Sequence, residues 1–178
     1  MRTTESYKIA HQNRINNAQG ALIEKEITRA CEYYKIQKIA DIEKTPEPLK
    51  IIKKLKSGTI VAKPTKDKAQ PDYKGILSTG ETIIFEAKST MKDSISRRVL
   101  TKKQMEVLEN YQQLGAQSFV LVALRQDFYM IPWLVWREMK IIFGKQSLKN
   151  EDLSEFKVPY KHGIMFLHHI TKIINERV

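Results

Sequence analysis

Residues 71–88 read Pro71-Asp72-Tyr73-Lys74-Gly75-Ile76-Leu77-Ser78-Thr79-Gly80-Glu81-Thr82-Ile83-Ile84-Phe85-Glu86-Ala87-Lys88. This stretch predicts two strands joined by a tight turn. Asp72 opens the first strand, Ser78-Thr79-Gly80 forms the turn, and residues 82–88 are a β-branched and aromatic run of strand length. We expect this hairpin to organise both the sheet and the candidate site.

The acidic residues of the hairpin are spaced to meet a lysine. Side chains alternate between the faces of a strand, so Glu86 and Lys88 would share one face. Ile83 and Phe85 would occupy the other, and hairpin pairing would bring Asp72 alongside Glu86. Two carboxylates suit Mg²⁺, and a lysine beside them suits charge growing on a phosphate. The alternative is a surface hairpin whose Glu86 and Lys88 pair in solvent, a contact worth about 0–1 kcal/mol.

Composition points to a polyanionic partner. The 178 residues include 31 Lys and Arg against 20 Asp and Glu, which gives a net charge of +11 and a pI of about 9.6. Nucleic acid or an anionic membrane surface would fit this charge. No apolar run approaches the roughly 20 residues that span a bilayer, and a single cysteine excludes an internal disulfide. We expect a soluble cytoplasmic protein with one domain over residues 20–178.

A helix is predicted from Gly20 to about Lys35. Ile23, Ile27, Ala30 and Tyr34 make its apolar stripe, at spacings of three and four residues. Glu24 would border this buried face, where a third acidic ligand could meet the strand-borne pair; a solvated helix glutamate is the alternative. Residues 1–19 lack such a stripe and are expected to form a flexible basic arm.

The segment between Lys44 and Pro71 carries four of the six prolines. It also holds eight lysines against only Glu47 and Asp67, a net charge of +6. We interpret residues 45–70 as a protruding helical or extended basic arm that contacts DNA; the alternative is a solvated lysine-rich loop. The candidate phosphate contacts are Lys53, Lys54, Lys56, Lys63, Lys66 and Lys68 in this segment, and Arg97 and Arg98 in the loop after Lys88.

The second half of the chain predicts helices and strands in alternation. Thr101 and Gln104 resemble a capping box that opens a helix ending near Gly115. The apolar run at 117–124 predicts a buried strand, followed by a strand at 128–131 and a helix at 132–143. This order is typical of a mixed sheet flanked by helices, an α/β domain.

Several motifs together resemble a known family. They are Gly20-x-x-x-Glu24, the basic proline-containing insertion, Asp72-Tyr73-Lys74-Gly75, Phe85-Glu86-Ala87-Lys88, Gln104, and Gly115 ahead of the strand Phe119-Val120-Leu121-Val122. In this order they look like a RecU-type Holliday-junction resolvase of the PD-(D/E)xK nuclease superfamily, over nearly the whole chain from Gly20. The resemblance implies a restriction-endonuclease-like mixed central sheet flanked by helices, with a protruding basic stalk inserted between early strands.

The resemblance also implies roles for residues. Asp72 and Glu86 would ligate Mg²⁺ or Mn²⁺, Lys88 would be the catalytic lysine, and Glu24 would be a further acidic residue acting on the metal directly or through water. Gln104 matches a polar helix position near the family's site, and this role competes with its role as a helix cap. The chain departs from the family at Gln70-Pro71, where small hydroxyl residues are expected before Asp72.

The function expected from this resemblance is structure-selective cleavage of four-way DNA junctions. Metal-dependent phosphodiester hydrolysis would make paired symmetric nicks, in homologous recombination and DNA repair. Because two cuts related by two-fold symmetry need two active sites, we expect a homodimer. Branched DNA would be the main partner, with recombination proteins as further candidates. The alternatives are another PD-(D/E)xK nuclease acting on duplex DNA and a non-catalytic architectural DNA-binding protein.

Overall fold

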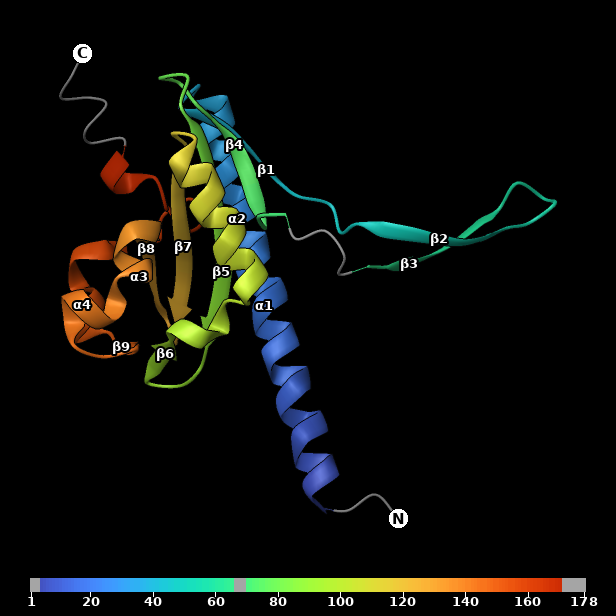
Figure 1. The fold of residues 1–178 in the computed structure, drawn as a ribbon, viewed down its shortest axis with the longest axis horizontal. Helices are drawn as coiled ribbons and strands as arrows, with labels where there is room; N and C mark the ends of the chain where they lie inside the picture. Colours follow the sequence, from blue (N-terminus) through green and yellow to red (C-terminus); the bar gives the residue numbers. More distant parts are fainter. Residues whose placement is uncertain (1–3, 66–69, 171–178) are drawn as a thin grey trace.

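A six-stranded mixed sheet lies at the centre of the molecule (Figure 1). The computed structural model describes residues 4–65 and 70–170. The sheet has the order β1-β4-β5-β7-β8-β10. Its strands are β1 (Ala40–Lys44), β4 (Tyr73–Leu77), β5 (Thr82–Thr90), β7 (Gln117–Leu124), β8 (Asp127–Pro132) and β10 (Lys157–Val158). Strands β5 and β7 pair in parallel and the other neighbours pair antiparallel, which confirms the expected mixed sheet.

Helices cover both faces of the sheet (Figure 1). Ile83 and Phe85 of β5 pack in the core shared with α1 (Thr4–Ile36), whereas Ile84 packs in the core on the other face. That second face is covered by α2 (Lys102–Gln113), α3 (Trp133–Arg137) and α4 (Met139–Phe143). The alternation predicted for residues 82–88 is therefore confirmed, and a single continuous helix over 132–143 is replaced by two short ones.

The remaining short elements sit at the edge of the second face. They are β6 (Ser94–Ser96), the 3₁₀ helix η1 (Arg97–Val99), β9 (Ser147–Lys149) and the 3₁₀ helix η2 (Glu151–Phe156). Strands β6 and β9 pair antiparallel in a separate two-stranded sheet. Through η1, this sheet leads directly into α2, so the loop after Lys88 is tied to the body of the protein.

Helix α1 begins much earlier than its apolar stripe predicts. It runs from Thr4, and its N-terminal half extends beyond the sheet (Figure 1). From Thr4 onward the segment is helical where the sequence pattern predicted no regular element, and its flexibility stays a prediction. Residues 1–3 lie outside the described residues. Residues 4–19 contain neither proline nor glycine and include several good helix formers, so backbone propensity can propagate the helix without an apolar face.

The lysine-rich insertion forms a hairpin that projects away from the body between β1 and β4 (Figure 1). We call this hairpin the stalk; it consists of β2 (Leu49–Lys54) and β3 (Ile60–Pro64), which pair antiparallel with a bulge between Ile51 and Lys53. Every residue of β2 is exposed, including its aliphatic ones. Of the two forms expected for the arm, the extended one is present.

Two glycines shape the β4–β5 hairpin. Gly80 adopts φ +85° in the turn, a conformation that side chains with a Cβ rarely adopt. At Gly75, a Cβ would lie 2.2 Å from the backbone oxygen of Asp41 on β1. Glycine at this position is therefore what allows β1 to pack directly against β4.

Candidate active site

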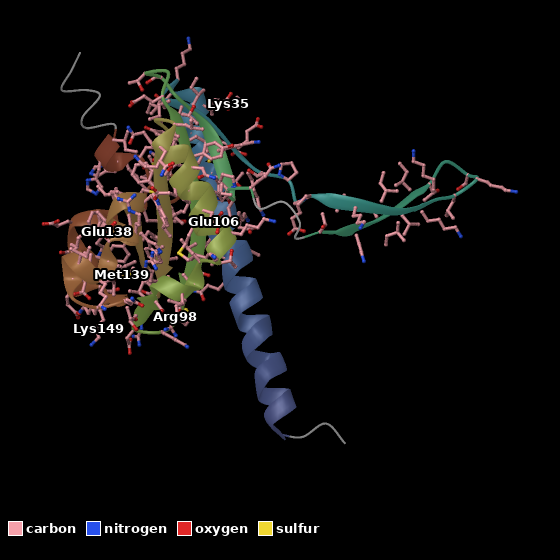
Figure 2. The ribbon with its side chains drawn as sticks, in the orientation of Figure 1. Lys35, Arg98, Glu106, Glu138, Met139 and Lys149 are labelled. Atoms are coloured by element: carbon pink, nitrogen blue, oxygen red, sulfur yellow. The ribbon has the colours of Figure 1, made fainter. Side chains whose placement is uncertain are left out.

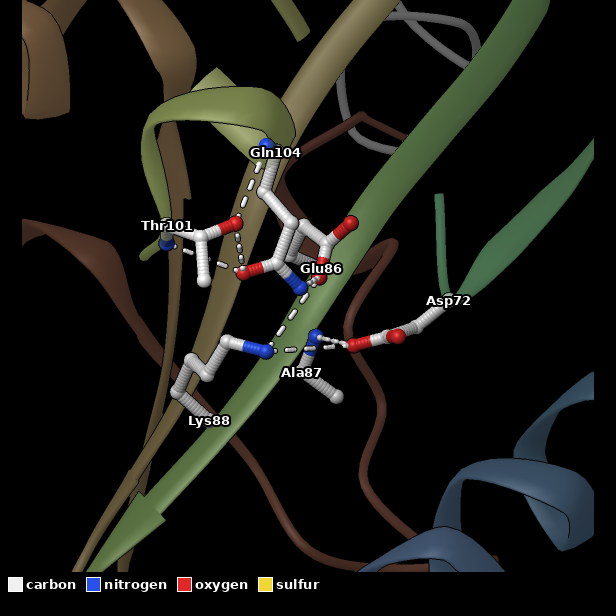
Figure 3. Close-up of polar contacts among 6 residues, drawn as sticks. All are labelled: Asp72, Glu86, Ala87, Lys88, Thr101 and Gln104. Carbon is white, nitrogen blue, oxygen red and sulfur yellow. Dashed lines mark hydrogen bonds and ion pairs between the residues drawn. The ribbon is translucent and has the colours of Figure 1, made fainter. Parts of the chain in front are cut away.

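The register of the β4–β5 hairpin places Asp72 beside Glu86. Tyr73 pairs with Phe85, so the residue before Tyr73 meets the residue after Phe85. The Asp72 carboxylate is also anchored across the hairpin, because its Oδ2 accepts a 3.0 Å hydrogen bond from the backbone N–H of Ala87 (Figure 3). The juxtaposition expected from the hairpin is present.

Lys88 lies between the two carboxylates (Figure 3). Its Nζ is 3.2 Å from Oε2 of Glu86 and 3.5 Å from Oδ2 of Asp72. The three side chains differ in exposure: Glu86 is fully buried, whereas Lys88 and Asp72 are 21% and 36% exposed. Solvent, or a substrate, can therefore approach Asp72 and Lys88 while Glu86 stays enclosed. Glu86 and Lys88 are thus not a solvated surface pair.

Glu86 is the most perturbed acid of the site. Burial, followed by the neighbouring negative charge of Asp72, raises the pKa of Glu86 from 4.5 to about 8, although Lys88 opposes this shift. Oε2 accepts hydrogen bonds, but Oε1 is buried without a hydrogen-bond partner in the described part of the chain. A buried carboxylate with one unpaired oxygen is suited to receive a cation or a proton.

Gln104 uses both ends of its side-chain amide. Its Oε1 accepts 3.1 Å and 3.2 Å hydrogen bonds from the backbone N–H and the hydroxyl of Thr101, which completes the predicted capping box of α2. Its Nε2 donates to Oε2 of Glu86 (Figure 3). The helix cap is therefore confirmed, and the same side chain also contacts Glu86, whereas a catalytic role of Gln104 stays a prediction. The sequence marked Thr101 only as a helix cap, although the cap lies beside the site.

Glu24 is not brought into this group. It is 48% exposed, and its Oε2 lies 2.6 Å from Nζ of Lys44. Among residues 4–65 and 70–170, no three Asp, Glu, His or Cys side chains are grouped to hold a metal ion. Glu26 of α1 is buried instead, and it accepts hydrogen bonds from Arg29 and from the hydroxyl of Tyr160.

Glu26 is buried and Glu24 is exposed because of how a distant segment packs on α1. The backbone N–H of Ile164 donates to the carbonyl of Glu26, and a Cβ at Gly163 would lie 2.4 Å from that oxygen. The segment around Gly163 therefore lies against the side of α1 that carries Glu26. Helical periodicity places Glu24 and Glu26 on either side of Ile23, but it cannot tell which side the chain will cover.

A cavity of about 510 Å³ opens next to the acidic pair, where the stalk joins the body. Its lining combines the base of the stalk, the segment before Asp72 and the first turn of α2: Thr45, Pro46, Glu47, Pro48, Thr65, Gln70, Pro71, Asp72, Thr101, Lys103 and Gln104. Threonine side chains from three segments thus line the cavity.

The lysines of the stalk are divided between the two faces of the hairpin. Cross-strand partners share a face, and Lys50 pairs with Lys63 while Lys53 pairs with Val61, so these three lysines lie on one face. Lys54 pairs with Ile60 on the other face. Lys56 lies beyond the end of β2, in the loop at the tip of the stalk.

The remaining predicted DNA contacts are two lysines outside the described residues and two arginines on the body. Lys66 and Lys68 lie outside the described residues. Arg97 and Arg98 lie in η1 on the body, and Figure 2 shows Arg98 well away from the stalk. Arg98 is exposed, whereas the Nε atom of Arg97 is buried. Arg98 is therefore the more exposed of the two arginines.

The residues present fit a hard divalent cation. Asp72 and Glu86 supply carboxylate oxygens side by side, and one oxygen of Glu86 has no partner among the described groups. The raised pKa of Glu86 indicates that Lys88 alone does not compensate two buried or half-buried negative charges. A bound cation would supply the missing positive charge.

The chain is similar to proteins of one family over most of its length. A family model described as RecU, recombination protein U, matches residues 18–176. A protein named Holliday junction resolvase RecU from Bacillus pumilus is 26% identical over 146 residues, 77% of this chain and 70% of that protein. The protein of the same name from Bacillus licheniformis is 27% identical and covers 89% of this chain and 83% of its own length. That from Leuconostoc citreum is 28% identical, over 79% of this chain and 73% of its own.

A more distant likeness is found among solved structures. The Holliday junction resolvase Hjc from Archaeoglobus fulgidus aligns with a TM-score of 0.47 and 10% identity, over 76% of this chain and 92% of that chain. A likeness at this level does not bear on function.

Proposed function

The chain belongs to the RecU family, and from this premise we propose that it resolves four-way (Holliday) DNA junctions as a structure-selective endodeoxyribonuclease. Relatives with which it shares 26–28% identity carry the name Holliday junction resolvase. The observation that carries the proposal is the meeting of Asp72, Glu86 and Lys88 at the foot of a lysine-bearing stalk. The protein acts in homologous recombination and DNA repair, in the cytoplasm.

Asp72 and Glu86 hold Mg²⁺, with Mn²⁺ as a substitute. Such an ion would supply Lewis acidity at the scissile phosphate and would lower the pKa of an attacking water. Lys88 is half-enclosed and lies against both carboxylates, which keeps its ammonium group where negative charge develops on the phosphate. Gln104 and the Ala87 backbone N–H hold the two carboxylates. Glu24 is exposed and paired with Lys44, so its role in the site is through water and not as a direct ligand.

The stalk binds the phosphates of branched DNA. Lys50, Lys53 and Lys63 lie on one face, and Lys50 stands directly opposite Lys63, where like charges repel each other. An anion placed over that face would relieve the repulsion and release counterions from DNA. Paired symmetric cuts require two sites, so the active form is a homodimer. Recombination proteins are further partners to be sought.

The test is cleavage of a labelled four-way junction and of a linear duplex of the same sequence, with Mg²⁺ and with EDTA. Native protein is expected to nick the junction symmetrically and to leave the duplex largely intact. Asp72→Asn and Lys88→Met are expected to bind the junction and to cut it roughly 100-fold more slowly or worse. The matched controls are Asp41→Asn, an exposed carboxylate on β1, and Lys149→Met, far from the stalk in Figure 2.

The outcomes separate the alternatives. Equal cutting of duplex and junction would mean a nuclease that is not selective for junctions. Binding without cutting under any divalent metal would mean an architectural DNA-binding protein. Normal cutting by Asp72→Asn would refute the site while leaving the activity. A monomer on junction DNA in analytical ultracentrifugation would contradict the paired-cut mechanism.

A further inference from the structure

We propose that the cavity at the base of the stalk receives one nucleobase of the junction, next to the scissile phosphate, and that Glu47 recognises the amino group of this base. Base recognition here rests on the proposed function, because it presupposes a DNA strand at the acidic pair. The cavity has a volume of about 510 Å³, and the stalk that contributes to it leaves the body between β1 and β4 (Figure 1). Pockets of roughly 300–1,000 Å³ hold drug-sized ligands, so a single base fits.

Backbone hydrogen bonds hold the cavity next to the acidic pair. The N–H of Thr45 donates to the carbonyl oxygen of Asp72 at 2.9 Å, and the N–H of Thr65 donates to that of Pro48 at 2.9 Å. The first bond ties the base of the stalk to the residue that opens the β4–β5 hairpin. Asp72 itself also lines the cavity. A phosphate at the acidic pair therefore has the cavity beside it, within reach of the base of the same nucleotide or the next.

Three prolines contribute rigid apolar parts of the wall: Pro46, Pro48 and Pro71. Because the proline ring fixes φ and removes the backbone N–H, these positions offer apolar ring surfaces and no main-chain donor. Enzymes that take a base out of the stack hold it between aromatic or apolar side chains. The wall therefore suits a flat base better than it suits a phosphate, which would need donors.

Glu47 is the unpaired acid of the cavity. The charged side chains of the lining are Glu47, Asp72 and Lys103. Asp72 is held by the backbone N–H of Ala87 and by Lys88. Glu47 is exposed, and within residues 4–65 and 70–170 it forms no hydrogen bond or ion pair.

A carboxylate at the base of a phosphate-binding stalk needs a hydrogen-bond donor from the DNA. Phosphate oxygens only accept hydrogen bonds and would repel Glu47, whereas the exocyclic amino groups of the bases donate. A glutamate accepts from N4 of cytosine, and N6 of adenine is the equivalent donor. Thymine presents a carbonyl oxygen at that position. Glu47 therefore favours cytosine or adenine and disfavours thymine.

Capture of a base also gives a physical reason for junction selectivity. Extrusion costs least where a base is already unpaired or poorly stacked. The strands part at the crossover of a four-way junction, so a base there leaves its stack more easily than a base in continuous duplex. The same cavity would thus be filled by a junction and left empty by a linear duplex.

The fluorescence of 2-aminopurine, which rises when this base leaves the stack, measures capture without cleavage. The probe replaces a nucleotide at the crossover of one junction and a nucleotide deep in an arm of a second junction. Full-length native protein is added in EDTA, so that the DNA is bound and not cut. A several-fold rise is expected for the crossover probe, and no rise is expected for the arm probe or for a linear duplex with the same probe.

Glu47→Ala tests recognition of the amino group, and Glu43→Ala is the matched control. Glu43 is an exposed acid on β1 that does not line the cavity. Cleavage with Mg²⁺ is measured on junctions that differ only in the base at the captured position. Native protein and Glu43→Ala are expected to cut the cytosine junction roughly 10-fold faster than the thymine junction. Glu47→Ala should bring this ratio to about 1, because alanine offers no acceptor.

Three results would each overturn the proposal: no rise of fluorescence at the crossover, a native rate that does not depend on the base, and a native ratio in Glu47→Ala. A divalent cation held by Glu47 and Asp72 is the competing occupant. A loss of Mg²⁺ affinity in Glu47→Ala, measured by calorimetry without DNA, would establish that occupant and refute recognition of a base.

Failure of the proposed function has a different signature. If native protein binds the junction and does not cut it, the resolvase assignment fails, whereas the fluorescence still decides whether a base is captured. The relative affinities for cytosine and thymine junctions, measured by anisotropy, then replace the cutting rates in the comparison of Glu47→Ala with Glu43→Ala.

Discussion

Replacing Glu86 with glutamine should stabilise the metal-free protein, and increasingly so as the pH rises. The native state keeps the Glu86 proton up to a pKa of about 8, whereas the unfolded chain releases it near 4.5. Between these values the native state binds more protons than the unfolded state, so the free energy of unfolding falls as the pH rises. Once native Glu86 is fully ionised, the free energy of unfolding has fallen by about 5 kcal/mol. At pH 7 it has already fallen by about 3 kcal/mol. Glutamine cannot ionise, so the variant escapes this loss.

Urea denaturation with EDTA at about pH 5, 7 and 9 measures the effect. The difference between variant and native protein cancels the titration of all other groups that the substitution leaves unperturbed. It should be small near pH 5 and should approach about 5 kcal/mol in favour of Glu86→Gln near pH 9. Mg²⁺ should reduce the difference at high pH, because a bound cation favours the ionised form of native Glu86.

Glu109→Gln is the control with the opposite sign. Hydrogen bonds from Trp133 and then Arg137 lower the pKa of Glu109. Its contribution to stability is present above the unfolded pKa of a glutamate and is lost as the pH falls, so Glu109→Gln should be less stable than native protein at neutral pH. A difference between Glu86→Gln and native protein that does not change with pH would refute the account of Glu86.

Three further predictions concern the contact between β1 and β4, the stalk and the metal. Gly75→Ala should lower the free energy of unfolding by roughly 1–3 kcal/mol or more, because its Cβ would lie 2.2 Å from a carbonyl oxygen of β1. The control is Gly20→Ala on α1, where a Cβ meets no atom within 4 Å and the change should be stabilising. Equal urea midpoints for the two variants would contradict this prediction. Replacing Lys50, Lys53 and Lys63 together by glutamine should reduce the salt slope of junction binding by about 2 to 3, measured by fluorescence anisotropy; an unchanged slope would remove this face from the interface. EDTA should abolish cleavage without abolishing junction binding, and metal-independent cutting in a gel assay would exclude the proposed chemistry.

The hairpin could be predicted from local pattern because its periodicity and its turn act over short distances. The two-residue period placed Glu86 and Lys88 on one face and Ile83 on the other. The hydrophobic pattern, in contrast, does not predict the N-terminal part of α1, which depends on helix propensity. The apolar stripe predicts a helix start near Gly20, whereas α1 continues back to Thr4 without such a stripe.

The sequence by itself determined the α/β class, the juxtaposition of Asp72 with Glu86 and Lys88, and the capping box of α2, because each depends on residues that are neighbours in a strand, a hairpin or a helical turn. Only the tertiary structure decided that Glu26 and not Glu24 is buried, because the segment around Gly163 packs on one side of α1. Only the tertiary structure joined the cap to the site, because the contact between Gln104 and Glu86 depends on how α2 lies across β5. The hairpin thus carries the acids, and the packing of α2 on that hairpin places the amide of Gln104 against Glu86.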